Sequence, residues 1–545
     1  MNTVSSFPVQ PEARPPMGFA GALRRLPARS APASILPRYT RPLLQGYRRV
    51  LFVLFVAVVA IIYGTLVARY GYMLLELFAP LAVFAVFLIW LLPDTETPPK
   101  RALIVLFWSF LTAQLLWPDY LALDLPGLPW ITALRLFGFP LALTFLTCLA
   151  VSPSMRTQLK QILASAPMVW KGLTAFLIIC ALSVVYSTSP SGSVDKLVVA
   201  ALYWGLIFFV SSYVFSRPGS VTVFVWAIWG TIIVIVALGL WEQRMSQVPW
   251  AGNIPSFLAV GDESVQRILA GTARAATGVY RVQGKFSTSL GLAEFLGLTT
   301  PFVLHLMLTA RNWIVRVAAL ITLPLMFACI ISTDSRLGVV GFMLSFLFYL
   351  FFWGYMRRRT HRQGMIGTAI VIAYPLILVG FLASTMFVPR VSSMVWGSGA
   401  QQASTNARRD QYNAGIPMVV ARPWGYGIGR GASQLGFVNR VGVGTIDTYV
   451  LMVALDVGII GLISYFGLFI AAVYAAAIAV QNARDRETRL LIPLAIALLN
   501  FLVIKTILSQ LDNHPLIFAM LGATVALVYR AQAKEPEKDA LPSRG

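Results

Sequence analysis

The sequence has little charge and almost no cysteine. Charged residues occupy 12% of its 545 positions and hydrophobic residues 58%, and the mean hydropathy is +0.74. This balance excludes an ordinary soluble globular domain. Cys148, Cys180 and Cys329 all lie in apolar runs, without the spacing of a metal site or a disulfide framework. We therefore expect a polytopic membrane protein whose cysteines are core residues.

Acidic residues are also scarce, with 21 against 43 basic residues and a formal net charge of +22. The basic residues are not interleaved with exposed aromatic residues on a soluble module, so we expect no nucleic-acid partner. A cleavable signal peptide is not expected either, because residues 1–49 carry eight arginines before the first apolar run. We interpret 1–49 as a basic, disordered cytoplasmic tail able to contact anionic membrane lipid, and 533–545 as a second cytoplasmic tail.

Apolar runs long enough to cross a hydrocarbon core of about 30 Å follow one another from residue 50 onward. They predict an all-α, polytopic integral membrane protein with a transmembrane domain over 50–532 and about 14 transmembrane helices. The third run is short and is interrupted by Gln114. The predicted spans are 50–67, 72–92, 102–117, 130–151, 168–187, 195–215, 220–241, 287–309, 313–333, 337–356, 364–387, 457–480, 488–508 and 513–531.

Basic residues mark alternate loops between these spans, which predicts that both chain ends are cytoplasmic. The opposite side then receives two long loops, 242–286 and 388–456, the second between the eleventh and twelfth spans. Short loops on that side are nearly uncharged, so the arginines of the long loops need another explanation. Inside the spans, Lys505 lies near a helix end where it can snorkel, whereas Glu294 and His305 are the better functional candidates.

The longest polar interruption of the chain, 390–461, is the strongest candidate for a site. Arginine suits phosphate and carboxylate recognition, whereas a solvated tether would do as well with lysine. Arg336 opens the tenth predicted span on the same side. It is either an interfacial residue or part of an anion site together with the arginines of the loop. Between Val388 and Ile446 the chain has no lysine, one acidic residue and six arginines: Arg390, Arg408, Arg409, Arg422, Arg430 and Arg440.

Two shorter motifs in this stretch have two interpretations each. The segment 423–431, PWGYGIGRG, lacks the βαβ context of a dinucleotide fingerprint. It predicts a tight turn, or a close approach of the backbone to a ligand or a neighbouring helix. Asp447 begins an apolar helical run nine residues before Asp456. It is either a helix cap or a general base that takes a proton from an attacking hydroxyl.

Five segments, in this order, resemble the O-antigen ligase and polymerase family, which comprises integral-membrane glycosyltransferases of bacterial polysaccharide assembly. They are LSVVYSTSPSGSVDKL (182–197), RVQGKFSTSLGLAEFLGLTTPF (281–302), TDSRLGVVG (333–341), ARRDQYNAGIPMVVARPWGYGIGRG (407–431) and DTYVLMVALDVGIIG (447–461). The resemblance covers about residues 165–510. It implies a GT-C-like membrane glycosyltransferase that transfers a glycan from polyprenyl diphosphate to an acceptor hydroxyl on the periplasmic side.

The resemblance also implies roles for individual residues. Arg336 matches the family's Ser-Arg position, and Arg408 or Arg409 matches the arginine that opens the segment before the glycine-rich turn. In the ligases these positions are associated with the diphosphate. Asp456 matches the acid before the Gly-x-x-Gly pair. Asp447–Thr448 stands where many ligases carry His-Asn, which favours a polymerase.

The sequence thus predicts a periplasm-facing polysaccharide polymerase in the inner membrane of a Gram-negative bacterium, with a ligase and a flippase of lipid-linked sugars as alternatives. The expected partners are a polyprenyl-diphosphate-linked glycan and membrane lipid, with a flippase and a chain-length regulator in the same pathway. We expect no cofactor and no metal, since no carboxylate cluster has metal-ligand spacing. His514 is either a substitute base or an ordinary loop residue. The predicted catalytic residues are Asp447, Arg409 and Arg336, and the predicted substrate-binding residues are Arg408, Arg281, Arg422, Arg430, Asp456 and His514.

Overall fold

The computed structural model describes residues 85–86, 88–89, 92, 94, 98–124, 130–273, 278–360, 365–387, 402–438, 444–483 and 485–533. These residues belong to one compact unit, Tyr72–Gly545. Four predicted features lie outside the described residues. They are the two cytoplasmic tails apart from Ala533, nearly all of the predicted spans 50–67 and 72–92, Arg390 and Arg440.

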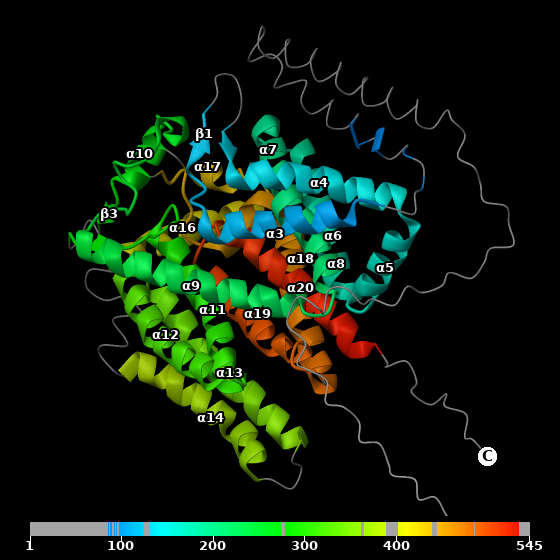
Figure 1. Cartoon of the computed structure of the whole chain (residues 1–545). Helices are drawn as coiled ribbons and strands as arrows, with labels where there is room; N and C mark the ends of the chain where they lie inside the picture. Colours follow the sequence, from blue (N-terminus) through cyan, green and yellow to red (C-terminus); the bar gives the residue numbers. More distant parts are fainter. Residues whose placement is uncertain are drawn as a thin grey trace, which may run out of the picture. The chain divides into compact units, whose positions relative to one another are not determined.

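The described chain is built almost entirely from helices (Figure 1). Eleven of its helical segments are long and apolar enough to cross a membrane, which confirms an all-α polytopic membrane protein. The 17-residue helix α3 (Lys100–Leu116) corresponds to the short third predicted span. The eleven segments are α4 (Ala133–Val151), α6 (Pro167–Val185), α7 (Pro190–Ala200) continuing into α8 (Ile207–Phe215), α9 (Ser220–Met245), α11 (Ser289–Thr309), α12 (Trp313–Ser332), α13 (Arg336–Thr360), α14 (Met365–Phe387), α18 (Tyr449–Ala479), α19 (Leu491–Lys505) and α20 (His514–Gln532).

Two predicted boundaries are wrong. The span expected from residue 195 begins at Pro190 and passes through a π-helical turn, η2 (Ala201–Leu206), before α8. The span expected from residue 457 starts beside a break of α18 at Gly458, but α18 already begins at Tyr449, so Asp456 lies in the helical segment before that break. An acidic residue is tolerated there because backbone amides of another segment donate hydrogen bonds to it.

Short elements connect the spans. The long loop predicted over 388–456 is partly helical, because α16 and α17 lie within it. Two antiparallel strand pairs, β1 with β2 and β3 with β4, close two of the other connections. The short elements are β1 (Ala122–Leu123), β2 (Ile131–Thr132), α5 (Pro153–Ala164), η3 (Ser256–Leu258), α10 (Glu263–Leu269), β3 (Thr272–Ala273), β4 (Tyr280–Arg281), α16 (Gln402–Ala421), α17 (Gly431–Leu435), η5 (Val480–Asn482) and η6 (Thr488–Leu490).

The helices differ strongly in how much protein surrounds them. Within the membrane-crossing part of each helix, 89% of α11 and 83% of α20 is buried, against 6% of α14. A helix that is apolar all round is buried inside a bundle or faces lipid. α11 and α20 are therefore central helices, whereas α14 packs beside α13 at the edge of the described bundle (Figure 1).

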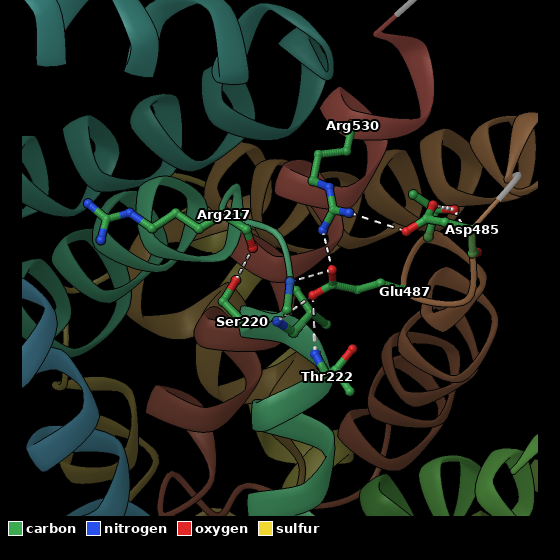
Figure 2. A network of polar contacts seen from close by, with 9 residues as sticks. Arg217, Ser220, Thr222, Asp485, Glu487 and Arg530 are labelled. Carbon is green, nitrogen blue, oxygen red and sulfur yellow. Dashed lines mark hydrogen bonds and ion pairs between the residues drawn. The ribbon is translucent and has the colours of Figure 1, made fainter. Parts of the chain in front are cut away.

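Glu487 connects two helix termini at one end of the bundle (Figure 2). Its carboxylate accepts hydrogen bonds from the backbone amides of Gly219 and Thr222 at 2.7 and 3.3 Å, where α9 begins. Arg530, near the end of α20, donates to Glu487 at 2.5 Å and to Asp485 at 3.2 Å. A carboxylate at a helix start is stabilised by the free amides and by the helix dipole. We call this the Glu487 end.

Candidate functional site

The other end of the bundle gathers the segments that the sequence analysis singled out. Helices α11, α13, α18 and α20 begin there, and α12 and α19 end there. Hydrogen bonds join the connecting segments: Arg281 Nε donates to Thr333 O at 3.1 Å, and Thr288 Oγ1 donates to Gln510 Oε1 at 3.3 Å. We call this the arginine end.

Arg336 is the first residue of α13 and contacts α16. The turn between α12 and α13 is tight, and Asp334 adopts a left-handed conformation in it, with φ of +51°. This turn places both terminal nitrogens of the Arg336 guanidinium 3.5 Å from Thr405 Oγ1. The contact joins two segments that are 69 residues apart in the sequence. The predicted association of Arg336 with the following arginine-rich segment is thus present in the fold.

Arg408 and Arg409 face different surroundings on α16. Residues three apart share one face of a helix, so Arg408 lies on the same face as Thr405. Arg408 is half-buried, whereas Arg409 is exposed. Burial lowers the pKa of Arg408, and the carboxylate of Asp447 opposes this shift by its attraction. The structure therefore brings Arg408, and not Arg409, toward Asp447.

Asp447 is held against α16 by its backbone. Its amide donates a hydrogen bond to Gln411 Oε1 at 2.9 Å, one turn after Arg408. The N-cap residue of α18 is Thr448, and no side chain caps that helix. The interpretation of Asp447 as a helix cap is therefore wrong. Its half-buried carboxylate stands in the field of a neighbouring guanidinium.

Three buried donor atoms around this site have no hydrogen-bond partner among the described residues. They are Ser335 Oγ, Arg408 Nε and Thr448 Oγ1. Ser335 precedes Arg336 in the chain, and Thr448 follows Asp447. Leaving a buried donor unsatisfied costs about 1–3 kcal/mol, so such groups are rare and call for an explanation. A ligand with several oxygen acceptors, such as a phosphate group, would satisfy them.

Asp456 supports the glycine-rich turn, to which Arg430 belongs. Its Oδ1 accepts a hydrogen bond from Gly431 N at 2.6 Å, and its backbone oxygen accepts one from Gly427 N at 2.9 Å. α18 is broken at Gly458, where φ is +76° and a Cβ atom would lie 2.2 Å from Pro423 O. The turn thus packs its backbone directly against the broken helix, which confirms the expected close approach.

The same turn is clamped from its other side by the segment between α6 and α7. Ile428 N donates to Ser183 Oγ at 3.0 Å, and Ser193 Oγ donates to Ile428 O at 2.9 Å. Both serines belong to the segment 182–197 that the family resemblance had included. Two predicted substrate-binding arginines have their contacts here. Arg422 lies over the ring of Tyr426 at 5.0 Å, and the Arg430 guanidinium lies against Gly192.

His514 is the first residue of α20 and is fully buried, so its interpretation as an ordinary loop residue is wrong. Its Nε2 lies 2.9 Å from Tyr465 Oη and 3.0 Å from Tyr449 Oη, and its Nδ1 lies 3.1 Å from Leu511 O. Both ring nitrogens are therefore engaged within the protein. Pro515 at the start of a helix is a signal that could have predicted this position.

Lys505 does not snorkel as predicted. It is fully buried and forms an ion pair of 2.8 Å with Glu294. His305 is also buried, and its Nδ1 lies 3.0 Å from Tyr349 Oη. The sequence analysis missed Lys285, which is 8% exposed and whose pKa burial lowers to about 8. Its neighbours include Asp119, a carboxylate more than 150 positions away in the sequence, which no local pattern relates to it.

The fold is that of a multi-pass, all-α membrane protein, and Arg281, Arg336 and Arg408 lie at one end of its bundle. Residues 321–466 match the sequence model of the family described as O-antigen ligase. This match supports assignment to the O-antigen ligase and polymerase family and confirms the resemblance over those residues. A comparison with curated proteins gave no match. Within the described part of the chain, no group of three His, Cys, Asp or Glu residues could hold a metal ion.

Proposed function

We propose that the arginine end binds the diphosphate of a polyprenyl-linked glycan and transfers that glycan to a hydroxyl of another lipid-linked repeat unit. The observation that carries this proposal is the group formed by Arg336, Arg408 and Asp447 with unpartnered buried donors beside it. The matched segment 321–466 contains all three residues. The family thus supports a ligase or polymerase type of membrane enzyme, and the polymerase role is our inference.

The charge of the site suits a diphosphate leaving group. Arg281, Arg336 and Arg408 supply three guanidinium groups at the arginine end, and the carboxylate of Asp447 acts on Arg408. In the reaction, the acceptor oxygen forms a bond to the anomeric carbon while the bond from that carbon to the phosphate oxygen breaks. The lipid diphosphate leaves with the electron pair. Fixed guanidinium groups stabilise the charge that grows on it, and such contacts are worth on the order of 3 kcal/mol each.

Asp447 is the proposed general base. A base must lie within reach of the proton that it abstracts, and Asp447 lies near Arg408, one of the arginines proposed to hold the leaving group. It takes the proton of the acceptor hydroxyl as the oxygen attacks. The replacement of the ligases' His-Asn by Asp447–Thr448 favours a polymerase. We further propose, from the loop charges, that the arginine end faces the periplasm from the inner membrane.

The two adjacent arginines of α16 provide the test. Arg408→Gln and Arg409→Gln remove the same charge from neighbouring positions, of which only the first lies near Asp447. In a strain lacking the chromosomal gene, Arg408→Gln should reduce polymer about a hundredfold or more. Arg409→Gln should support nearly wild-type chain lengths. If both variants reach equal amounts in the membrane and yield equal amounts of polymer, the assignment of the site is overturned.

A ligase is the second candidate, because the matching family is described by that activity. The intermediates that accumulate in a deletion strain separate the two activities. A missing polymerase leaves single repeats on the lipid carrier, whereas a missing ligase leaves long lipid-linked chains that are not attached to an acceptor. A flippase would need paired charges at mid-membrane. The buried pair Glu294 and Lys505 instead lies near helix termini at the arginine end.

A further inference from the structure

A second polar cluster lies at the arginine end and plays no part in the proposed diphosphate site. Four elements contribute to it: the end of α3, the loop before β1, the segment before α11, and the connection between α19 and α20. Gln114 Nε2 donates to Asp512 O at 2.8 Å, and Ser287 Oγ donates to Asp512 Oδ2 at 2.8 Å. Gln114 is the residue that interrupts the third predicted span, and this contact explains its presence in an apolar helix.

Lys285 forms the base of this cluster. Only 8% of its surface is exposed, and its ammonium donates one hydrogen bond, to Gln114 O. An ammonium has three N–H donors. Among the described residues it has no second hydrogen-bond acceptor, and no carboxylate oxygen lies within 4 Å of it. The ammonium also lies 4.7 Å from the centroid of the Phe286 ring. A cation that is more than nine-tenths buried therefore keeps an N–H donor that no acceptor among the described residues satisfies.

The cluster extends from the interior of the protein to its surface, because Lys285 is 8% exposed whereas Asp119 is exposed. We call this cluster the recess. Desolvation is the largest cause that raises the pKa of Asp119. The groups that act on its charge are Thr132, Asp512, Lys285 and Arg135.

The charged groups of this recess balance one another. Lys285 and Arg135 are opposed by Asp119 and Asp512, so the recess has no net charge. Two carboxylates would repel an anionic group, while an ammonium beside them can donate. A neutral ligand with several hydroxyls, which both donate and accept hydrogen bonds, fits this set. A sugar is such a ligand.

The chain limits the distance between the recess and the proposed diphosphate site. Ser509 Oγ donates to Ile446 O, the residue before Asp447, and Asp512 follows three residues later. At about 3.6 Å per residue, this path keeps Asp512 within roughly 20 Å of Asp447. Lys285 is four residues from Arg281, which is at most about 14 Å of chain. A short stretch of glycan would bridge the two sites.

We propose that Lys285, Asp119 and Asp512 form the subsite that binds the hydroxyls of the acceptor sugar and orients it toward the donor. The proposal rests on the proposed glycan transfer and names the place of its second substrate. Lys285 donates to one sugar hydroxyl, and the two carboxylates accept from others. These three residues are positioning residues, whereas proton abstraction stays with Asp447.

The test separates the two substrates. Full-length protein in lipid nanodiscs is titrated with undecaprenyl diphosphate, and each variant is also scored for polymer in the deletion strain. Lys285→Met and Asp119→Asn should lower the polymer yield about ten- to a hundredfold. This factor corresponds to the loss of one hydrogen bond to a charged group. Both should bind undecaprenyl diphosphate within about twofold of wild type, because the probe carries no acceptor sugar. Asp124→Asn removes an exposed carboxylate from the same loop region and is the matched control.

Two results would overturn the acceptor subsite. One is wild-type polymer from both variants, and the other is loss of undecaprenyl diphosphate binding as large as that of Arg408→Gln. Asp119 is exposed, so its variant reports on the recess even where Lys285→Met fails to fold. Wild-type binding of the probe by Arg408→Gln contradicts the diphosphate site instead. That outcome is independent of the polymer yields of the Lys285 and Asp119 variants.

Discussion

The ammonium of Lys505 lies 2.8 Å from the carboxylate of Glu294, and both side chains are fully buried. Asn513 Nδ2 donates to the other Glu294 oxygen at 3.1 Å, and Lys505 also donates to Gln510 O. These bonds connect α11, α19 and the segment before α20 at the arginine end. A buried ion pair adds little net stability, since desolvation offsets attraction, but losing one partner leaves a buried charge unpaired. The pair therefore fixes these three segments relative to one another.

Removing either member of this pair should be more damaging than removing both. Glu294→Gln or Lys505→Met alone should lower the free energy of unfolding by about 3–5 kcal/mol, and the double variant should recover most of that loss. Thermal unfolding of the purified full chain in detergent measures the effect. The exposed pair Arg156 and Asp94, 45% and 61% accessible, is the control, and its removal should change little. Single variants as stable as the double variant would refute this role.

The break in α18 provides the second prediction. Gly458→Ala should destabilise the chain by about 1–3 kcal/mol because its φ of +76° and ψ of −177° form a backbone conformation essentially restricted to glycine, and by more because the new Cβ would clash with Pro423 O. Gly467 lies in the same helix with open space around its Cβ position. Gly467→Ala should be neutral or stabilise the helix by up to about 1 kcal/mol. Polymer yield should fall only in the Gly458 variant, because only that residue packs against the glycine-rich turn. Equal melting temperatures for both variants would contradict this packing.

His514 provides the third prediction, which tests a structural against a catalytic role. His514→Phe fills the space but leaves the hydroxyls of Tyr449 and Tyr465 without their shared partner, at a cost of about 1–3 kcal/mol. Stability and polymer yield should fall together, and Tyr465→Phe should show the same pattern more weakly. A stable, fully inserted His514→Phe variant with polymer lowered a hundredfold would instead identify His514 as a base.

The spans of this protein could be predicted because apolar length alone defines a membrane helix. The twelve predicted spans from residue 102 onward all correspond to helices in the described chain. Boundaries failed where a polar residue has a distant partner. Asp456 ended a predicted loop, but it lies inside α18 because amides of the glycine-rich turn, 25 residues away, donate to it. Local hydropathy contains no information about that turn.

The candidate site was predictable in its residue types but not in its geometry. An arginine-rich stretch on a weakly charged side suggested an anion site; in the structure Arg336 contacts Thr405 of α16, and Asp447 acts on Arg408 of the same helix. The choice between Arg408 and Arg409 depended on which face of α16 packs against the bundle, which one sequence does not show. Lys285 lay in a short motif without any local charge partner, so only the fold reveals its carboxylate neighbours.

Lys285 leads to the last prediction, a dependence of stability on pH. Burial lowers its pKa from 10.5 to about 8, while Asp512 and Asp119 pull in the opposite direction and Arg135 faces Asp119. Between these two values the unfolded chain holds the proton and the folded chain does not. The free energy of unfolding should therefore rise with pH through this window. Lys285→Met should flatten that rise in thermal unfolding measured from pH 7 to 10, and an unchanged slope in the variant would contradict the burial of the ammonium.

The same titration should act on activity in the opposite direction. The acceptor subsite needs the ammonium as a donor, so polymer synthesis by purified protein should fall as the pH rises through about 8. Lys285→Arg keeps its proton at every pH used, since arginine titrates above about 12, and should retain its activity at pH 9 relative to pH 7. Initial rates for the two proteins, each normalised to its own value at pH 7, give the comparison. Parallel profiles would show that the loss at high pH comes from another group, and that Lys285 does not donate to the acceptor sugar.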